Sequence, residues 1–533
     1  MILLRNVLIP VDKPLDNLTL IAAKKLKISA KEISSAEIFR RSVDVRKKSN
    51  PCFCCTLKIE FKNAKTKTYV LKNFNNSSEY KKSEYTCPLP KSVPKTRPVI
   101  AGSGPAGIFA ALTLARAGIK PLIIERGSSV EKRALLVNNF WQNGCLNLNS
   151  NVQFGEGGAG TFSDGKLNTG IKDRRCRHVL ETFHAFGADR DILINAKPHI
   201  GTDVLRNVVA NMRDEIISLG GEYMFETTVL NPIIMDNKIV SVACRNNLNN
   251  KCFEIECGSL ILAIGNAARD TVTSLLKNGV ELVAKPFAVG VRIEHLQERI
   301  NRAQYGENYS KNLPACEYKL AVHLPSGRGV YTFCMCPGGV VVNGASETGT
   351  IVTNGMSYRA RNKLNANSAL LVGINTDDFD NDPLKGIEFQ RKIEQAAFNA
   401  FGTYNAPAQT VGSFLNTNTE NIFTDVIPSI MPKAMPYDLN NILPDFICRS
   451  LREALELLNK KLPGFADPAA VLTAPETRSS APYRFVRSEA YETTIKGVFA
   501  CGEGSGYAGG ITSSAVDGIR CAEQYILSVV NKG

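Results

Sequence analysis

The chain has 533 residues, of which 44% are hydrophobic, and a net charge of +14. This length and composition indicate a globular protein of two to four domains, and no apolar run approaches the roughly 18–20 residues that span a bilayer. The composition therefore excludes a membrane-spanning protein and predicts a soluble one.

The N-terminal segment predicts a small basic α+β domain over residues 1–90. Residues 2–9 suit a strand, residues 15–26 suit a helix, and residues 55–62 alternate between apolar and polar side chains. Arg5 interrupts the first apolar run and no cleavage-type site follows, so a strand is favoured over a secretory signal. We therefore expect a cytoplasmic protein with reduced thiols.

The positive charge is concentrated in this domain. Residues 1–97 contain 21 Lys or Arg against 8 Asp or Glu, whereas the remaining 436 residues contain 43 against 42. The dense block Arg40–Lys48 suggests an anionic partner, either RNA or an acidic protein, and the alternative is a solvated surface.

A Pro-rich connector leads to residues 98–125, which have every part of a dinucleotide-binding unit. An apolar strand enters the turn Gly102-Ser103-Gly104-Pro105-Ala106-Gly107, a helix follows, and a second apolar strand leads to Glu125 and Arg126. Gly102 permits the tight turn, Gly104 lets the backbone approach a pyrophosphate, and Gly107 allows helix and strand to pack closely. Glu125 can accept hydrogen bonds from an adenosine ribose. The sequence thus predicts an adenine-nucleotide site here.

The same glycine spacing occurs at residues 155–160 and 504–509, but neither copy is followed by a second strand that carries an acid. We expect these to be loops that complete the same site, with Gly157, Gly158 and Ala159 passing close to the cofactor. A single complete unit argues against a separate NAD(P)H domain. Arg133 is a candidate pyrophosphate contact, or else a helix surface charge.

Further along, residues 259–265 predict a buried strand that ends at Gly265 near the cofactor. Residues 285–470 combine irregular strands with helices near 386–401 and 446–458, which indicates a substrate-side domain. A helix from about 513 to 530 returns to the nucleotide domain.

Several reactive side chains lie outside the fingerprint. His199 and His295 are candidate proton donors or acceptors, and Lys166 is a candidate partner of the cofactor or of an acidic substrate. Cys334 and Cys336 are a candidate redox dithiol, although a CxC linkage is strained. The 15 cysteines and five histidines show no zinc spacing, so no metal is predicted.

The chain resembles bacterial and plastid flavoproteins known as uncharacterised FAD-dependent dehydrogenases. The resemblance rests on residues 40–48, 151–167, 197–202, 285–295, 333–339 and 501–510. It implies FAD as cofactor and a glutathione-reductase-like FAD-binding Rossmann domain with an inserted α+β substrate domain. It also implies that Glu503, after Gly502, binds the ribityl chain. Gly509, Gly510 and Ile511 would then bring a helix N-terminus to the flavin.

We therefore expect a basic domain over 1–90, an FAD-binding domain over 91–284 and 471–533, and a substrate-side domain over 285–470. The predicted activity is FAD-dependent oxidation or reduction of a small molecule of unknown identity, at the flavin N5. NAD(P)H would bind transiently, or the substrate would reduce the flavin directly. The alternatives are a flavoprotein that acts on RNA through its basic domain, and a non-catalytic flavin-dependent scaffold.

Overall fold

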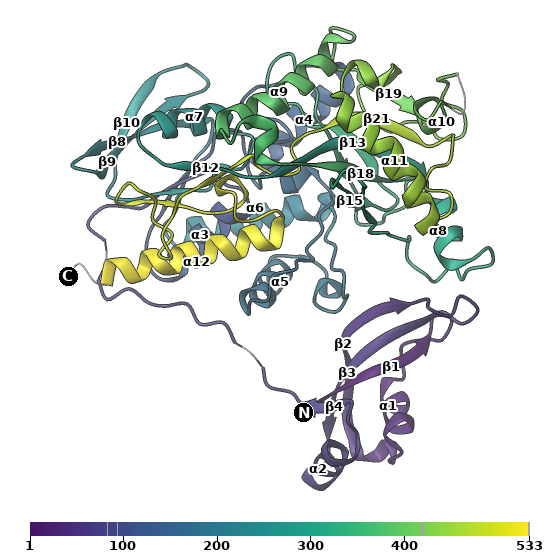
Figure 1. Ribbon diagram of the computed structural model, residues 1–533. Coiled ribbons are helices and arrows are strands. Elements are labelled where there is room, and N and C mark those ends of the chain that lie inside the picture. The colour runs from purple at the N-terminus through teal and green to yellow at the C-terminus, as the bar shows by residue number, and fades with distance from the viewer. Residues whose placement is uncertain (83, 93, 417–419, 531–533) are drawn as a thin grey trace.

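The computed structural model describes residues 1–82, 84–92, 94–416 and 420–530, which form a small N-terminal unit and a larger body (Figure 1). Within these residues, no helix combines the length and the apolar character needed to cross a membrane.

The N-terminal unit is a four-stranded antiparallel sheet with two helices. The strand order is β2-β3-β1-β4. Cys55, Leu57 and Ile59 alternate inward from β3 and form its core with residues of β1 and α1. The helix that we predicted from residue 15 begins at Leu18, because the Asn17 side chain accepts a hydrogen bond from the amide of Leu20 and caps it. The elements are β1 (Ile2–Pro10), α1 (Leu18–Leu26), β2 (Ile33–Asp44), β3 (Cys52–Phe61), α2 (Ala64–Asn73) and β4 (Ser77–Glu79).

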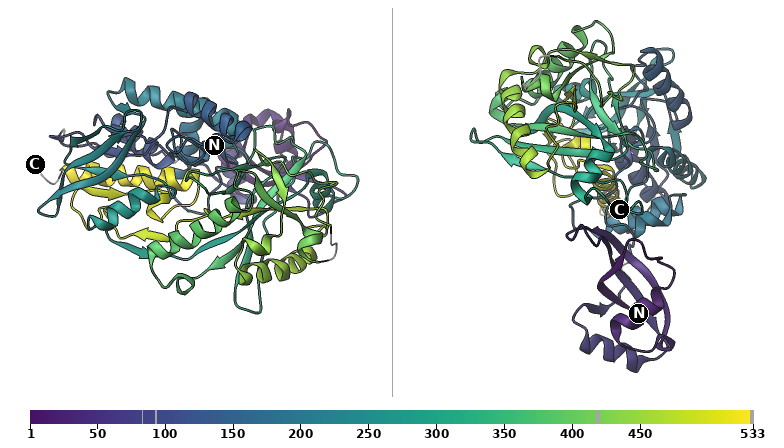
Figure 2. Two further views of the ribbon diagram at one scale, coloured as in Figure 1. Left: turned by 90° about the horizontal axis from the view of Figure 1, so that it is seen from above. Right: turned by 90° about the vertical axis from the view of Figure 1, so that its right-hand side faces the viewer.

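Part of the basic block attaches this unit to the larger body. The Arg41 amide donates to the Ile194 carbonyl at 2.8 Å, and the Arg41 guanidinium donates to the Asn195 side chain at 2.9 Å. Lys48 donates to the Ala303 carbonyl at 2.9 Å. The rest of the unit projects from one end of the molecule (Figure 2).

The larger body is built around a five-stranded parallel sheet. Its order is β23-β11-β5-β6-β7, so the first strand of the nucleotide fingerprint lies centrally. Every residue of β5, β6, β11 and β23 is buried, as expected for a parallel sheet covered on both faces. The strands are β5 (Val99–Ala101), β6 (Leu122–Ile124), β7 (Glu222–Met224), β11 (Leu260–Leu262) and β23 (Val498–Ala500).

Different layers cover the two faces of this sheet. One face packs against the helices α3 (Pro105–Arg116), α5 (Arg175–Ala185), α6 (Thr202–Ser218) and α12 (Ile511–Val530). The other packs against α7 (Arg269–Lys277) and the antiparallel strands β8 (Thr227–Met235), β9 (Lys238–Asn246) and β10 (Cys252–Glu256). Helix α4 (Val130–Asn143) follows β6. The result is a Rossmann-like α/β fold, whose ligand crevice is expected at the carboxyl ends of β5 and β11.

A seven-stranded mixed sheet forms the second half of the body, in the order β14-β15-β18-β13-β21-β19-β20. In β13, Val291 and Ile293 pack with residues of the helix α11 (Asp445–Lys461), while Arg292 and Glu294 point to the opposite face. The strands are β13 (Phe287–Leu296), β14 (Ala321–His323), β15 (Gly329–Cys336), β18 (Asn365–Ile374), β19 (Ala406–Thr410), β20 (Ala434–Pro436) and β21 (Val471–Glu476).

Helices and two short strand pairs complete the larger body, and the first of these pairs packs in the core on one face of the five-stranded sheet. The helices are α8 (Gln297–Tyr305), α9 (Pro383–Asn399), α10 (Val411–Phe414) and α11 (Asp445–Lys461). The pairs are β12 (Leu282–Ala284) with β22 (Tyr483–Phe485), and β16 (Val340–Asn343) with β17 (Thr353–Met356).

The strand β21 extends this half beyond the boundary that we predicted at residue 470. It pairs with β13 and with β19, so residues 471–476 belong to the seven-stranded sheet, and the chain returns to the five-stranded sheet afterwards.

Candidate functional site

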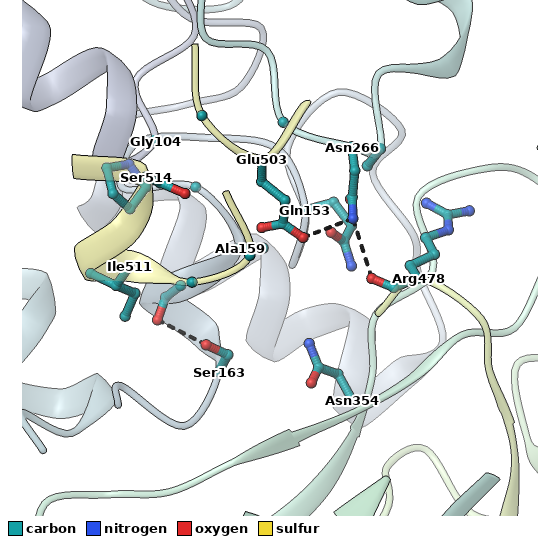
Figure 3. A pocket seen from close by; sticks show the side chains of 18 of the residues that line it. Gly104, Gln153, Ala159, Ser163, Asn266, Asn354, Arg478, Glu503, Ile511 and Ser514 are labelled. Carbon is teal, nitrogen blue, oxygen red and sulfur yellow. Dashed lines mark hydrogen bonds between the residues drawn. The ribbon is translucent and has the colours of Figure 1, made fainter. Parts of the chain in front are cut away.

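A cavity of about 450 Å³ lies between the two large sheets, at the carboxyl ends of β5, β6 and β11. It is lined by residues of the glycine turn, of the segment 153–168, of the segments after β11 and β21, and of the segment 502–514. Figure 3 shows part of this lining, with Gly104, Ala159, Glu503 and Ile511 around one region and Asn354 and Arg478 on the seven-stranded side.

The glycine turn is packed too closely for side chains. Gly102 has a φ of +100°, and a Cβ there would lie 2.5 Å from the Ala263 carbonyl oxygen. A Cβ on Gly107 would lie 2.0 Å from the Gly102 carbonyl oxygen. Gly104, Pro105 and Ala106 line the cavity where α3 begins, so free backbone N–H groups and the positive helix end face it. This arrangement suits a pyrophosphate.

The second glycine-rich loop lies directly against this turn. The Gly157 amide donates to the Ser103 carbonyl at 2.8 Å, and a Cβ on Gly158 would lie 2.9 Å from the Gly104 Cα. Gly158 and Ala159 line the cavity, and Gly157 supports them from behind. The two glycine loops therefore form one continuous wall.

Glu125 has partners within the protein. Its carboxylate accepts hydrogen bonds from the Ser103 amide at 2.8 Å, from the Ser103 hydroxyl at 3.0 Å, and from the amides of Gly127 and Gly155 at 2.9 Å each. A carboxylate has about four acceptor positions, so Glu125 fixes the turn to the second loop. Glu125 also lines the cavity, and the ribose contact that we predicted for it stays a prediction.

Arg126 lies beside Glu125 at the same end of the cavity. Its guanidinium bonds to Asp270 and Thr271 at 2.8 Å each and lies 4.4 Å from the centre of the Phe154 ring. This end of the cavity, with Val229 and neighbouring apolar groups, suits a flat heterocycle.

Arg133 does not occupy the position that we predicted. Its side chain is fully buried behind the loop, and its guanidinium donates to the carbonyls of Asn151, Val152, Gly155, Glu156 and Gly158. It is neither a pyrophosphate contact nor a surface charge. The carbonyls that the loop turns inward need a buried donor, and Arg133 supplies it.

The residues after β23 form the opposite wall. Gly502, Glu503, Gly509, Gly510 and Ile511 line the cavity, and α12 begins at Ile511 with its N-terminus toward it (Figure 3). Gly265, with a φ of +68°, lines the cavity after β11.

Glu503 is the most electrostatically perturbed group of this wall. Burial raises the pKa of its carboxyl to about 7, and the charge of Lys285 opposes that rise. The side-chain amide of Asn266 donates to Glu503 at 2.9 Å and to the Arg478 carbonyl at 3.2 Å (Figure 3). Glu503 can therefore both donate and accept hydrogen bonds near neutral pH.

Lys166 reaches the cavity from the loop after the second glycine motif. Its ammonium lies 3.2 Å from the Asp164 carboxylate and donates to the Met335 carbonyl. Although burial lowers the pKa of Lys166, the charge of Asp164 and the nearby thiols Cys334 and Cys336 raise it above the ordinary value. The ammonium thus stays charged in the cavity wall.

The two histidines lie outside the cavity wall. His199 lies one layer behind it, with Nε2 2.6 Å from the Asp164 carbonyl oxygen, and burial lowers its pKa to about 4. His295 lies in the core beside Phe465, and burial lowers its pKa as well. Each ring bonds to a buried backbone carbonyl through Nε2, whereas Nδ1 of His295 is buried without a hydrogen-bond partner among the described residues. Neither ring lines the cavity, so the structure does not bring them to the site as proton donors or acceptors.

A buried ionic network that our sequence analysis did not predict supports the cavity from the side of α9. Arg269 and Arg478 both bind the Glu394 carboxylate, at distances from 2.8 to 3.0 Å. Burial raises the pKa of Glu394, but the two guanidiniums outweigh it and hold the pKa well below the ordinary value. These residues lie far apart in the sequence and follow no motif, so only the fold unites them.

Two family models match segments that contribute to the lining of this cavity. Residues 95–139 match an FAD binding domain, and residues 286–479 match "FAD-dependent protein, C-terminal domain-like". Residues 1–60 match a domain of unknown function. The chain is also 45% identical to an uncharacterized protein of Clostridium beijerinckii over 528 residues, which are 98% of each chain.

The solved structures that match this chain do so at low identity. A flavin-dependent brominase, Bmp2, has a TM-score of 0.38 and 13% identity, over 82% of this chain and 80% of that one. A geranylgeranyl bacteriochlorophyll reductase-like protein of Thermoplasma acidophilum has a TM-score of 0.36 and 11% identity, over 81% and 79%. The E. coli quinol fumarate reductase subunit FrdA has a TM-score of 0.35 and 13% identity, over 82% and 71%.

FAD is therefore the cofactor of this chain, which confirms the sequence prediction. The cavity fits it on independent grounds. The glycine turn brings backbone without side chains to the cavity wall, free amides open α3, and the positive end of α12 meets the same cavity. Gly104 and Ala106 would hold the diphosphate, Glu125 and Arg126 the adenosine, and Glu503 and Ile511 the flavin end.

Proposed function

The chain belongs to the same family as the Clostridium beijerinckii protein and binds FAD, and from this premise we propose that it is an FAD-dependent oxidoreductase of a small molecule. FAD supplies two-electron oxidation or reduction when bound, with transfer at the flavin N5. One observation carries the proposal: the cavity continues past the cofactor-binding residues to a wall formed by Lys166, Lys319 and Asn354.

We also infer that the fold is of the glutathione-reductase-like type. Three features support this assignment. The fingerprint strand β5 is central in the parallel sheet. In the sequence, the antiparallel strands β8–β10 fall between β7 and β11, and β23 and α12 follow the inserted seven-stranded sheet.

At the flavin end, the chain's own residues would tune the cofactor. The positive N-terminus of α12 favours negative charge in the cavity. Glu503, held by Asn266, would bond a hydroxyl of the ribityl chain.

At the substrate end, Lys166 is the residue that we propose to bind an anionic group of the substrate. Its charge is maintained by Asp164, and its position is fixed by the Met335 carbonyl. His199, which bonds to the Asp164 carbonyl, would position this loop without contacting the substrate. The preferred substrate is thus a small acid.

Anaerobic mixing with reduced nicotinamide tests the proposal. Bleaching of the flavin absorbance by NADH or NADPH would identify a transiently bound reductant. If both leave the absorbance unchanged, small acids are screened for the same bleaching, which would identify a substrate that reduces the flavin directly. A flavin that no reductant and no candidate substrate changes would argue for a non-catalytic scaffold.

We keep an anionic partner of the N-terminal unit as a separate proposal. Arg40 and Lys47 of the predicted basic block are exposed, and so are Lys24, Lys25 and Lys27 of and after α1, so both groups are available to an anionic partner. The partner that we propose is RNA, and a gel shift with tRNA that weakens as salt rises would support it. Failure to bind at low salt would exclude it.

A further inference from the structure

Cys334 and Cys336 lie at the end of β15, where the strand departs from regular pairing. Phe333 pairs with Ala369 and Cys336 with Asn367, so β15 carries one extra residue, and Cys334 has a φ of +44°. Such a bulge bends the strand and re-aims its side chains. The two sulfurs and a carboxylate oxygen of Asp164 all lie within 4.8 Å of one another.

The two thiols differ in access. Cys334 is half-buried and lines the cavity that takes FAD, whereas Cys336 is completely buried behind it. A solute in the cavity can therefore reach Cys334 first.

Positive charge surrounds the pair. The Arg292 guanidinium lies 3.2 Å from the Cys336 sulfur and donates to the Cys334 carbonyl at 2.6 Å. Lys166 donates to the carbonyl of the intervening Met335. These two cations, together with the ion pair between Lys166 and Asp164, disfavour a metal ion at the three possible ligands.

The same surroundings shift the pKa values of the two thiols in opposite directions. A hydrogen bond from the Cys336 thiol lowers the pKa of Cys334 to about 7; Lys166 and Arg292 act in the same direction, against burial and the Asp164 charge. Burial raises the pKa of Cys336 well above its usual range. A thiolate beside a protonated thiol is the starting state for thiol–disulfide chemistry.

We propose that Cys334 and Cys336 are a redox-active dithiol that exchanges two electrons with the FAD held in the same cavity. In the oxidising direction, an S–S bond forms between the two sulfurs, and the pair loses two electrons and two protons. Oxidised FAD is reduced by those two electrons and two protons, so no further reactant is needed. The inference rests on the proposed function, because it needs a flavin that changes its redox state.

An anaerobic reductive titration of the full-length holoprotein tests this. Dithionite is added while the flavin absorbance is recorded, for the wild-type protein, for the double variant C334S/C336S and for Cys145→Ser. Cys145 is an exposed thiol and serves as the matched control. Because a disulfide takes up two electrons, we expect about four electrons per FAD in the wild type and in Cys145→Ser, and about two in the double variant.

Peptide analysis of the wild-type protein gives a second readout that needs no variant. Alkylation followed by mass spectrometry should find a Cys334–Cys336 disulfide before the titration and two alkylated thiols after it. The inference is overturned if the wild-type protein takes up only two electrons per FAD. Protein that holds no FAD to titrate would remove the proposed function as well, so the two failures are distinguishable.

Discussion

The Asn266 side chain donates a 2.9 Å hydrogen bond to the carboxyl group of Glu503, and so joins the residues after β11 to the loop after β23. Both segments line the FAD cavity, and they come from neighbouring strands of the parallel sheet. The ionisation of one buried acid, Glu503, therefore bears directly on the cofactor site.

Glu503 should give the apoprotein a pH-dependent stability. Burial raises the pKa of its carboxyl to about 7, so the folded state holds a proton that the unfolded state has released. The stability due to the neutral carboxyl is present at low pH and is lost as the pH rises toward 7. Glu503→Gln keeps an oxygen that accepts from Asn266, and the Tm of this apoprotein should fall less than that of the wild type between pH 5 and pH 8. An equal fall in both proteins would contradict the assignment.

His199 should make the folded protein less stable at acid pH. Burial lowers the pKa of its imidazole to about 4. Below the ordinary pKa of histidine, the unfolded chain therefore binds a proton that the folded protein does not. The resulting loss of stability starts near the ordinary pKa and reaches about 3 kcal/mol by pH 4. His199→Gln, which keeps a donor for the Asp164 carbonyl, should flatten this acid limb in urea unfolding. A midpoint that depends on pH as in the wild type would refute the claim.

Gly107 should tolerate no side chain. In Gly107→Ala the new Cβ would lie 2.0 Å from the Gly102 carbonyl oxygen, which is backbone and cannot move aside cheaply. We expect the turn to open and FAD affinity to fall by about tenfold or more, since a displacement worth about 1.4 kcal/mol already has that effect. Titration of the apoprotein with FAD, followed by flavin fluorescence, measures it.

Gly170→Ala is the matched control, because a Cβ at Gly170 meets nothing within 4 Å. It should bind FAD as the wild type does. Equal affinities for Gly107→Ala and Gly170→Ala would show that the turn does not carry the site.

Arg133 should be essential for the loop of residues 151–158. Arg133→Met removes the donor of five buried carbonyls, and the unfolding free energy should fall by about 3 kcal/mol or more. Arg174→Met, at an exposed arginine, should cost less than about 0.5 kcal/mol. Urea unfolding of both variants checks this, and a loss below about 1 kcal/mol for Arg133→Met would contradict the role.

The fold was predictable where local pattern determines it. The glycine turn, β5, β6 and the helix after them follow the fingerprint spacing, and α9, α11 and α12 follow helical periodicity to within a few residues at each end. The seven-stranded sheet was not predictable as a unit, because β13, β18 and β21 pair over long sequence separations that no turn signal marks.

The residues of the site also divide into those that the sequence predicts and those that it does not. The glycines could be predicted from their spacing, because a close backbone approach excludes every other residue, and most of those predicted line the cavity. Charged and polar side chains do not, because their role depends on what the fold places opposite them. Arg133 meets inward carbonyls, His295 meets the Phe465 carbonyl in the core, and Arg269 meets Glu394 from α9.

The central claim is that the cavity between the glycine turn and α12 holds one FAD. Purified protein that has been saturated with FAD and freed of excess should be denatured, and the released flavin identified and counted against protein. We predict FAD at a ratio of about one per chain, bound before denaturation with the visible absorbance bands of a protein-held flavin. Protein that stays colourless after incubation with FAD and releases none would contradict the account.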